Sequence, residues 1–326
     1  MTTSGRTPDY QRLTYLFMCT DPVHVGTGGY RLGRVDNSIV RDPGTNVPKI
    51  PGSSLHGAAR AYAASVLNRP SCAGQGNPKR NDTRQNGQSG HCGVCPVCYT
   101  FGYSKNTDDQ SAYSGTVNVF DAEILLFPVH SLEGPVWITT KSRLERLSGA
   151  EMASLSQPEH EESVIPLFET TENILTLGWL VLAIQPQNPE EAVGQLPGTL
   201  PEQIANHIVL VHENLFSNIV NSNLEIRTSV AINPERGAAE DGALFTYEAI
   251  PRTTILAADV VIDDYHQLHS PDNGTAACIN PQEVLEGGLC LISWLGVGGM
   301  GTRGFGRMEM LEQPEPEHYR QEETDD

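Results

Sequence analysis

The chain has 326 residues and a formal net charge of −19, a length that suits one large domain or two small ones. No apolar run approaches the roughly 18 residues that a membrane-spanning helix needs, and the first residues lack the basic and then apolar layout of a signal peptide. The sequence therefore favours a cytoplasmic protein, and its seven cysteines are expected to be thiols or metal ligands rather than disulfides.

The charge is unevenly distributed. Residues 1–147 carry a net charge of +4, whereas residues 148–326 carry −23. Because screening at physiological salt limits the reach of a charge to about 8 Å, a basic face can bind nucleic acid beside an acidic remainder. On charge alone, an ordinary acidic protein is the alternative. We expect one domain over residues 1–312, with an insertion near 70–100, and an acidic, disordered tail over 313–326.

The clearest predicted element is a helix from Ser53 to Asn68, which follows a buried strand at 13–19 and a loop rich in glycine and proline. Ser53 or Ser54 can cap this helix, and its apolar residues recur along one face. His56 and Arg60, four residues apart, share a different face.

The remaining elements follow in chain order. They are strands at 117–127 and 136–140, a helical stretch near Arg143, a strand at 174–184, a helix at 201–221, strands at 224–232 and 243–262, and a last strand at 289–295. This order favours an α+β fold of the ferredoxin-like kind with long insertions.

The loop that begins at His24 and ends at the helix start has the composition of an anion-binding segment. Its glycines let backbone amides approach a phosphate closely, and the helix start adds unpaired N–H donors. Positive charge comes from Arg31, Arg34, Arg41, Lys49 and Arg60. The pattern predicts anion or nucleic-acid binding, and the alternative is a surface loop whose glycines only make turns.

Asp36 lies in the middle of this loop. An exposed carboxylate there could hold a divalent ion or take a proton from a nucleophile. A turn or capping role is the alternative for Asp36, and ordinary packing or hydrogen bonding is the alternative for His24.

A cysteine motif predicts a metal site. Cys92, Cys95 and Cys98 are separated by two residues each, with His91 directly before them and Cys72 twenty residues before Cys92. Thiolates at this spacing can fold onto one tetrahedral zinc ion, which would help to order the polar segment around them. The fourth ligand could be Cys72 or His91. An iron–sulfur cluster and free thiols are the alternatives.

A second glycine-rich segment, Trp294 to Met310, contains six glycines together with Arg303 and Arg307. It does not have the strand, GxGxxG and helix order of a dinucleotide-binding motif. It could line an RNA path or close the sheet.

Several segments together resemble one family. They are a HxGxG turn at His24, VDNSIVRD at 35–42, IPGSSLHGAAR at 50–60, the stretch 114–140, LFTYEAIPRTTIL at 244–256 and GGMGTRGFGR at 298–307. These motifs resemble the RAMP superfamily of CRISPR systems. Within it, they resemble the repeated backbone subunit of type III-B effectors, the fourth subunit of the Cmr complex.

This resemblance implies a modified RNA-recognition fold with a protruding β-hairpin thumb. It implies that several copies stack along one guide RNA beside other effector subunits, and that each cleaves single-stranded target RNA with Mg²⁺ or Mn²⁺. Asp36 matches the cleavage residue, with His24 and Glu248 as possible helpers. The residues expected to contact RNA are Gly26, Gly28, Arg34, Arg41, Ser53, Ser54, His56, Arg60, Gly299, Arg303 and Gly304.

One position departs from the family pattern: His56 stands where relatives usually have a lysine, so this contact with the guide is weaker or neutral at pH 7. Two alternatives remain to endoribonuclease action in the assembled complex. One is a structural RNA-binding subunit that does not cleave. The other is a guide-processing ribonuclease with a metal-independent, histidine-centred mechanism.

Overall fold

The computed structural model describes residues 10–28, 35–74, 91–103, 113–149, 151–153, 155–186, 194, 196–263, 280–314 and 317–319. Arg34, one of the expected RNA contacts, lies outside these residues, as does most of the expected tail. Within that tail, residues 317–319 form a short strand that pairs with the first strand of the chain. None of the described helices is both long and apolar enough to cross a membrane.

The fold is built on one large mixed sheet in which the described strands follow the order β12-β1-β11-β3-β4-β8-β5-β7-β6. The strands are β1 Tyr10–Cys19, β3 Val117–Ser131, β4 Gly134–Thr139, β5 Ser163–Pro166, β6 Ile174–Leu177, β7 Leu180–Ile184, β8 Ile208–Val211, β11 Ile255–Asp263 and β12 Met308–Met310. Two short strands lie off this path, with β2 (Lys49–Ile50) paired to β3 and β13 (Glu317–Tyr319) paired to β1.

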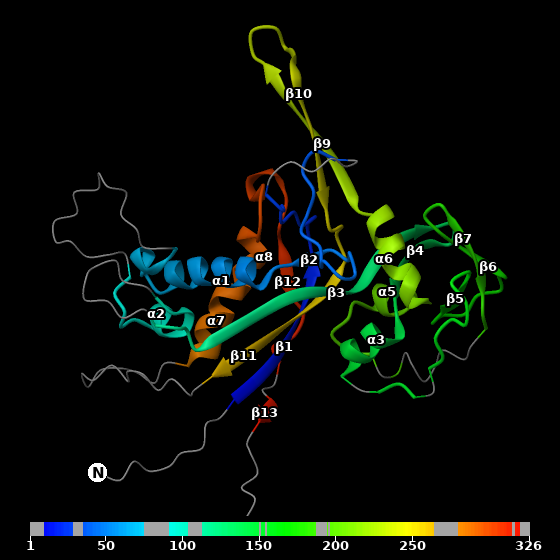
Figure 1. Ribbon diagram of the computed structural model, residues 1–326, viewed down its shortest axis with the longest axis horizontal. Helices are drawn as coiled ribbons and strands as arrows, with labels where there is room; N and C mark the ends of the chain where they lie inside the picture. Colours follow the sequence, from blue (N-terminus) through cyan, green and yellow to red (C-terminus); the bar gives the residue numbers. More distant parts are fainter. Residues whose placement is uncertain are drawn as a thin grey trace, which may run out of the picture.

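β3 connects the two halves of the sheet. Residues 117–126 pair antiparallel with β11, whereas residues 127–131 pair with β4. Figure 1 shows β3 running from the side of α1, α2 and α7 to the side of β4 to β8. Its carboxyl-terminal half is almost fully buried, because it has a packed layer on each face. One long strand therefore places both halves of the molecule in a single frame.

The helices lie in two groups. On one side are α1 (Gly52–Val66), α2 (Pro96–Phe101), α7 (Pro281–Cys290) and α8 (Ile292–Leu295), with 3₁₀ turns η1 (Pro70–Cys72) and η2 (Gly301–Arg303). On the other side are α3 (Lys141–Ser148), α5 (Glu202–Ala205) and α6 (Glu213–Ser222). α1 and α7 approach closely at Gly288, where an added Cβ would lie 2.2 Å from the main-chain oxygen of Ala59.

A separate two-stranded hairpin, β9 (Glu225–Asn233) and β10 (Ala238–Ala249), projects from the body (Figure 1). Apolar side chains remain exposed on it, among them Val230, Ile232 and Leu244. Since Leu244 pairs directly with Val230, the exposed face is continuous across both strands. The predicted α+β class with a β-hairpin is confirmed.

Two predicted elements were wrong in type. Residues 289–295, predicted as a strand, are the end of α7 followed by α8. Leu285, Leu289 and Ile292 are all buried at helical spacing, and a short apolar run alone cannot reveal that spacing. Residues 201–221, predicted as one helix, are α5 and α6 separated by β8, whose four residues are all buried.

Two boundaries also differ from prediction. The predicted strand at 174–184 is two strands joined at Gly178, which has a φ of 63°. Helix α1 begins at Gly52 after Pro51, so Ser53 and Ser54 lie inside its first turn and no side chain caps it. Only glycine fits at position 52, because a Cβ there would lie 2.2 Å from the Val119 oxygen.

The α1–α7 contact leads to a stability prediction. Gly288→Ala should destabilise the protein by about 1–3 kcal/mol, because the new Cβ meets backbone atoms of Ala59. Gly287→Ala is the matched control: no atom lies within 4 Å of its Cβ, and alanine is favoured over glycine in a helix by about 0.5–1 kcal/mol. Denaturant unfolding measures both, and equal midpoints would contradict the close contact.

Candidate functional site

Asp36 is exposed and fixed to the root of the β9–β10 hairpin. Its Oδ2 accepts hydrogen bonds from the main-chain N–H of Thr246 at 2.8 Å and from the Thr246 hydroxyl at 2.7 Å. The Thr246 hydroxyl, followed by the Thr246 amide, lowers the pKa of Asp36, so the carboxylate is ionised at neutral pH. Its Oδ1 accepts no hydrogen bond from the described residues and can take a ligand or a proton.

The backbone holds the Asp36 loop against the same strand. Asn37 bridges to Tyr247, with Asn37 N–H donating to the Thr246 oxygen at 3.0 Å and Glu248 N–H donating to the Asn37 oxygen at 3.1 Å. The loop is thus an added short strand beside β10. Thr246 was missed by sequence reasoning, although it precedes the candidate Glu248 by two residues and so points to the same side of β10.

His24 is buried behind this loop. Its Nδ1 is 2.6 Å from the main-chain oxygen of Glu248; because that oxygen only accepts, Nδ1 carries a hydrogen. The ring of His24 meets the Tyr247 ring edge-on at 5.8 Å. The other ring nitrogen, Nε2, faces Gly26, where a Cβ would be 3.1 Å away.

The glycine-rich segment near the carboxyl terminus packs against His24. Gly299 N–H donates to the His24 oxygen at 2.9 Å. Gly298 has a φ of 84°, and a Cβ there would lie 2.4 Å from the same oxygen, so a larger residue would separate the segment from His24. The structure thereby brings together the first and last glycine-rich motifs, which lie far apart in sequence.

Glu248 and Arg41 form a buried ion pair. Glu248 Oε1 is 2.7 Å from Arg41 Nη2, and Glu248 Oε2 accepts from the N–H of Ile39 at 3.3 Å. Arg41 also donates to Asn221 Oδ1 at 2.8 Å and to the Ile39 oxygen at 3.0 Å. The expected helper Glu248 and the expected RNA contact Arg41 therefore have partners within the protein, and their contacts position the loop.

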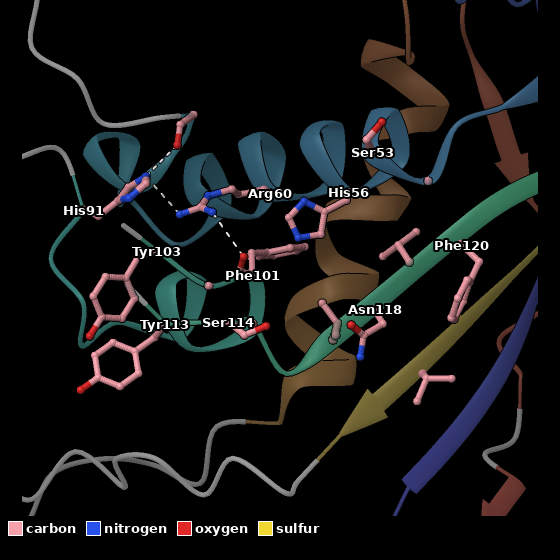
Figure 2. A pocket seen from close by; sticks show the side chains of 17 residues that line it. Ser53, His56, Arg60, His91, Phe101, Tyr103, Tyr113, Ser114, Asn118 and Phe120 are labelled. Atoms are coloured by element: carbon pink, nitrogen blue, oxygen red, sulfur yellow. Dashed lines mark hydrogen bonds between the residues drawn. The ribbon is translucent and has the colours of Figure 1, made fainter. Parts of the chain in front are cut away.

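Ser53, His56 and Arg60 line an open cavity of about 1090 Å³. Figure 2 shows the aromatic rings that share it, namely Phe101, Tyr103, Tyr113 and Phe120. The ring of His56 meets that of Phe101 edge-on at 5.1 Å. Burial, and then the charge of Arg60, lower the pKa of His56, so this ring is neutral at pH 7.

Arg60 has a different role from the one expected. It is buried, and its guanidinium donates to the main-chain oxygens of Cys72 at 3.0 Å and Phe101 at 3.4 Å. Its Nη2 also lies 3.2 Å from His91 Nε2. These contacts, drawn in Figure 2 for Phe101 and His91, tie α1 to the cysteine-containing segments and leave little of the charge for a phosphate.

Four cysteines converge in a group that could hold a metal ion. The sulfur atoms of Cys72, Cys92, Cys95 and Cys98, here called the cysteine cluster, all lie within 4.8 Å of one another. Cys72 and Cys92 are 3.6 Å apart, close to the roughly 3.8 Å between sulfurs around tetrahedral zinc. Hydrogen bonding from the Cys98 thiol lowers the pKa of Cys95 to about 4, so a thiolate is readily available.

Of the two candidates for the fourth ligand, the structure brings Cys72 into the cluster and leaves His91 outside it. His91 Nε2 is instead 2.6 Å from the Gly74 oxygen and close to Arg60. The remaining expected RNA contacts lie at the surface: Gly26, Gly28, Ser53, Gly299, Arg303 and Gly304 are exposed, and Ser54 is half-buried.

Comparisons with known proteins agree with this architecture. A sequence model of the RAMP superfamily matches residues 16–309. The chain is 28% identical over 300 residues to the "CRISPR system Cmr endoribonuclease Cmr4" of Pyrococcus furiosus, covering 87% of this chain and 90% of that one. It is 31% identical over 106 residues to the "CRISPR system Cms endoribonuclease Csm3" of Methanothermobacter thermautotrophicus, covering 32% and 38%.

Two solved structures share the fold. Type III-B Cmr-beta bound to cognate target RNA matches with a TM-score of 0.59 at 14% identity, covering 92% of this chain and 96% of that one. Oligomeric Cmr4 from Pyrococcus furiosus matches with a TM-score of 0.56 at 20% identity, covering 95% and 99%.

The cysteine cluster predicts which variant loses the metal. Protein purified without chelators should contain about one metal ion per chain by elemental analysis. Cys72→Ser should lose it, because one of four ligands is gone, whereas His91→Gln should keep it. Metal retained by Cys72→Ser but lost from His91→Gln would show that the cluster is not the ligand set, and metal-free wild-type protein would remove the site altogether.

Proposed function

The chain belongs to the RAMP superfamily, and we propose that it is a repeated backbone subunit of a type III CRISPR effector that binds guide RNA and cleaves the complementary target RNA. Its relative of similar length is named an endoribonuclease, and one structure with this fold holds cognate target RNA. The observation that carries the proposal is the exposed, ionised carboxylate of Asp36 at the root of the hairpin. A cytoplasmic location and a role in antiviral defence follow.

The geometry suits cleavage of a distorted RNA strand. RNA can be cut when its own 2′-hydroxyl attacks the adjacent phosphorus in line, a geometry that stacked A-form RNA does not provide. The exposed apolar residues of the β9–β10 hairpin can insert between bases and displace a nucleotide. Because Asp36 is hydrogen-bonded to β10 itself at Thr246, a nucleotide displaced at the hairpin root would lie beside its carboxylate.

Asp36 can act in two ways that its contacts allow. Its Oδ1 can take the 2′-hydroxyl proton, or it can hold a divalent ion such as Mg²⁺ or Mn²⁺. Among the described residues, Asp36 belongs to no group of three converging metal-ligating side chains, so phosphate oxygens and water would complete the shell, as Mg²⁺ commonly requires. Such an ion would stabilise negative charge on the phosphoryl oxygens.

His24 and Glu248 support Asp36 through the backbone. His24 holds the Glu248 carbonyl, and Glu248 anchors Ile39 and Arg41 of the Asp36 loop. We assign both as positioning residues, because each is buried and directs its hydrogen bonds to the protein.

Guide RNA would run past the exposed glycines and the start of α1 into the aromatic cavity. With Arg60 engaged by main-chain oxygens and His56 neutral, this cavity offers ring faces more than positive charge. Stacking of a base on an aromatic side chain contributes about 1–3 kcal/mol, enough to replace one phosphate contact. The aromatic lining therefore offsets the lysine that relatives have at position 56.

The cysteine cluster would hold a structural zinc ion, because four thiolates in a closed tetrahedral arrangement are typical of structural zinc. It has no role in cleavage, and it is distinct from the ion at Asp36. Further copies of this chain and other effector subunits would be its protein partners.

The central prediction concerns Asp36. Asp36→Asn keeps the size of the side chain but removes its charge, so target cleavage in the assembled complex should fall by roughly 100-fold or more, while guide and target binding are unchanged. Asp42→Asn is the control, since Asp42 is an exposed carboxylate of the same loop that only caps a turn. Cleavage and RNA retention are measured on the same preparations.

Two results would contradict this assignment. Undiminished cleavage by Asp36→Asn would mean that another group, or another subunit, cuts the target. Cleavage that survives removal of divalent ions by a chelator would favour a histidine-centred mechanism like that of guide-processing ribonucleases.

His56 gives a pH prediction. Since its pKa is lowered in the fold, lowering the pH from about 7.5 to about 5.5 should protonate it beside RNA phosphates and raise RNA affinity a few-fold. His56→Lys should bind more tightly at all these pH values, and His56→Gln should lose the pH dependence. Because the folded-state pKa lies below the unfolded one, protonation also makes the fold less stable as the pH falls below about 6.5. Identical pH profiles for wild type and His56→Gln would exclude His56 from the RNA path.

A further inference from the structure

An apolar patch lies at the end of the sheet farthest from β12. It consists of four large side chains that are mostly exposed, namely Leu132 (84%), Trp179 (73%), Val181 (60%) and Ile174 (54%), and we call it the sheet-end patch. Trp179 lies in the turn between β6 and β7, and β6 ends the strand order. An exposed apolar cluster of this kind often marks a protein interaction site.

The patch is held in place by regular structure. Along β6 and β7, Leu175, Leu177 and Leu182 point into the core. The alternate residues, including Ile174 and Val181, point outward, as strand geometry requires. The register of the hairpin pairs Thr176 with Val181, so the outward residues of both strands share one face.

Leu132 joins the same face from a different turn. Its main-chain N–H donates to the Thr176 hydroxyl at 2.9 Å, and Gly178 N–H donates to the His130 oxygen at 2.9 Å. The β3–β4 turn is therefore bonded to the β6–β7 hairpin. The patch is a composite surface whose members are fixed relative to one another.

The surroundings of the patch are acidic without compensation. Residues 147–226 contain eleven Asp and Glu and no Lys or Arg. Glu133, Glu169 and Glu172 line an open cavity of about 930 Å³ that also reaches Phe168 and Ile184, next to the patch. None of these three glutamates forms an ion pair with another described residue.

We propose that the sheet-end patch docks a different protein subunit, one that presents apolar side chains bordered by lysine or arginine. An apolar centre with a charged rim is the usual anatomy of a protein interface, and tryptophan is favoured at its centre. Opposite charge on the rim would speed association and select the partner.

The charge argues against the other occupants. RNA would meet only negative charge here, which opposes phosphate binding. A second copy placed symmetrically would bring two acidic rims together. A second copy placed head to tail would need free cations, but Arg12, Lys49, Arg143 and Arg146 are already ion-paired within the chain.

Photo-crosslinking tests this proposal in the complex purified from its own cells. A photoreactive amino acid replaces Trp179 in one sample and Trp294 in the other, which is similarly exposed at 77% but lies outside the patch. We expect position 179 to crosslink to a peptide of another protein with a net positive charge, and position 294 not to crosslink to that peptide. A crosslink from position 179 to RNA, to a copy of this chain, or to no polymer would overturn the proposal.

Substitution gives an independent measurement. Trp179→Asp, and separately Glu169→Lys with Glu172→Lys, should reduce the amount of that crosslinked subunit in the purified complex by roughly tenfold or more, and raising salt should weaken the wild-type contact. Trp294→Asp should leave the subunit in place. Its retention by both patch variants would sink the idea. The guide RNA content and target cleavage of the same samples report on the proposed function separately, because the patch takes no part in either.

Discussion

The candidate site depends on the buried ion pair between Arg41 and Glu248. One partner lies in the loop that carries Asp36 and the other in β10, so the 2.7 Å contact joins segments more than 200 residues apart. Each charge also has neutral hydrogen-bond partners, in Ile39 and Asn221, which is the condition under which a buried pair is tolerated. Removing one partner would leave the other charge unpaired at the base of the hairpin, and the loop would lose its attachment. The reactive carboxylate is thus exposed because its neighbours are buried and satisfied.

The same arrangement separates the chemistry of the chain into two regions. The basic residues of the first half are mostly used within the fold, so the expected RNA surface is formed by glycine backbone, aromatic rings and a few exposed cations such as Arg303. The acidic second half has no comparable set of cations. A net charge of −19 is compatible with RNA binding under these conditions, because the negative charge gathers around the far end of the sheet. There it would repel RNA that strays from its path.

How much of this could be predicted from the sequence depended on the range of the interactions. Strand β1, helix α1 and the cysteine motif follow from local spacing, and they were predicted. The type of residues 289–295 was not, since a seven-residue apolar run fits either period and the packing of α7 on α1 decides it. Nor could spacing show that Arg41 and Arg60 are engaged internally, because their partners lie in distant segments. Thr246 carried only a weak signal, its position two residues before Glu248.

Arg60 also links the metal cluster to the RNA cavity. Its guanidinium bonds to the carbonyl of Cys72, one of the cluster residues, and to the carbonyl of Phe101, whose ring faces His56. A metal ion that fixes Cys72 relative to Cys95 and Cys98 would therefore fix the place of Phe101 as well, because α2 begins directly after Cys95. In this arrangement the structural metal contributes no charge to the bound RNA. It holds in position the aromatic wall against which a base would stack, and a site with few free cations depends on that wall for its affinity.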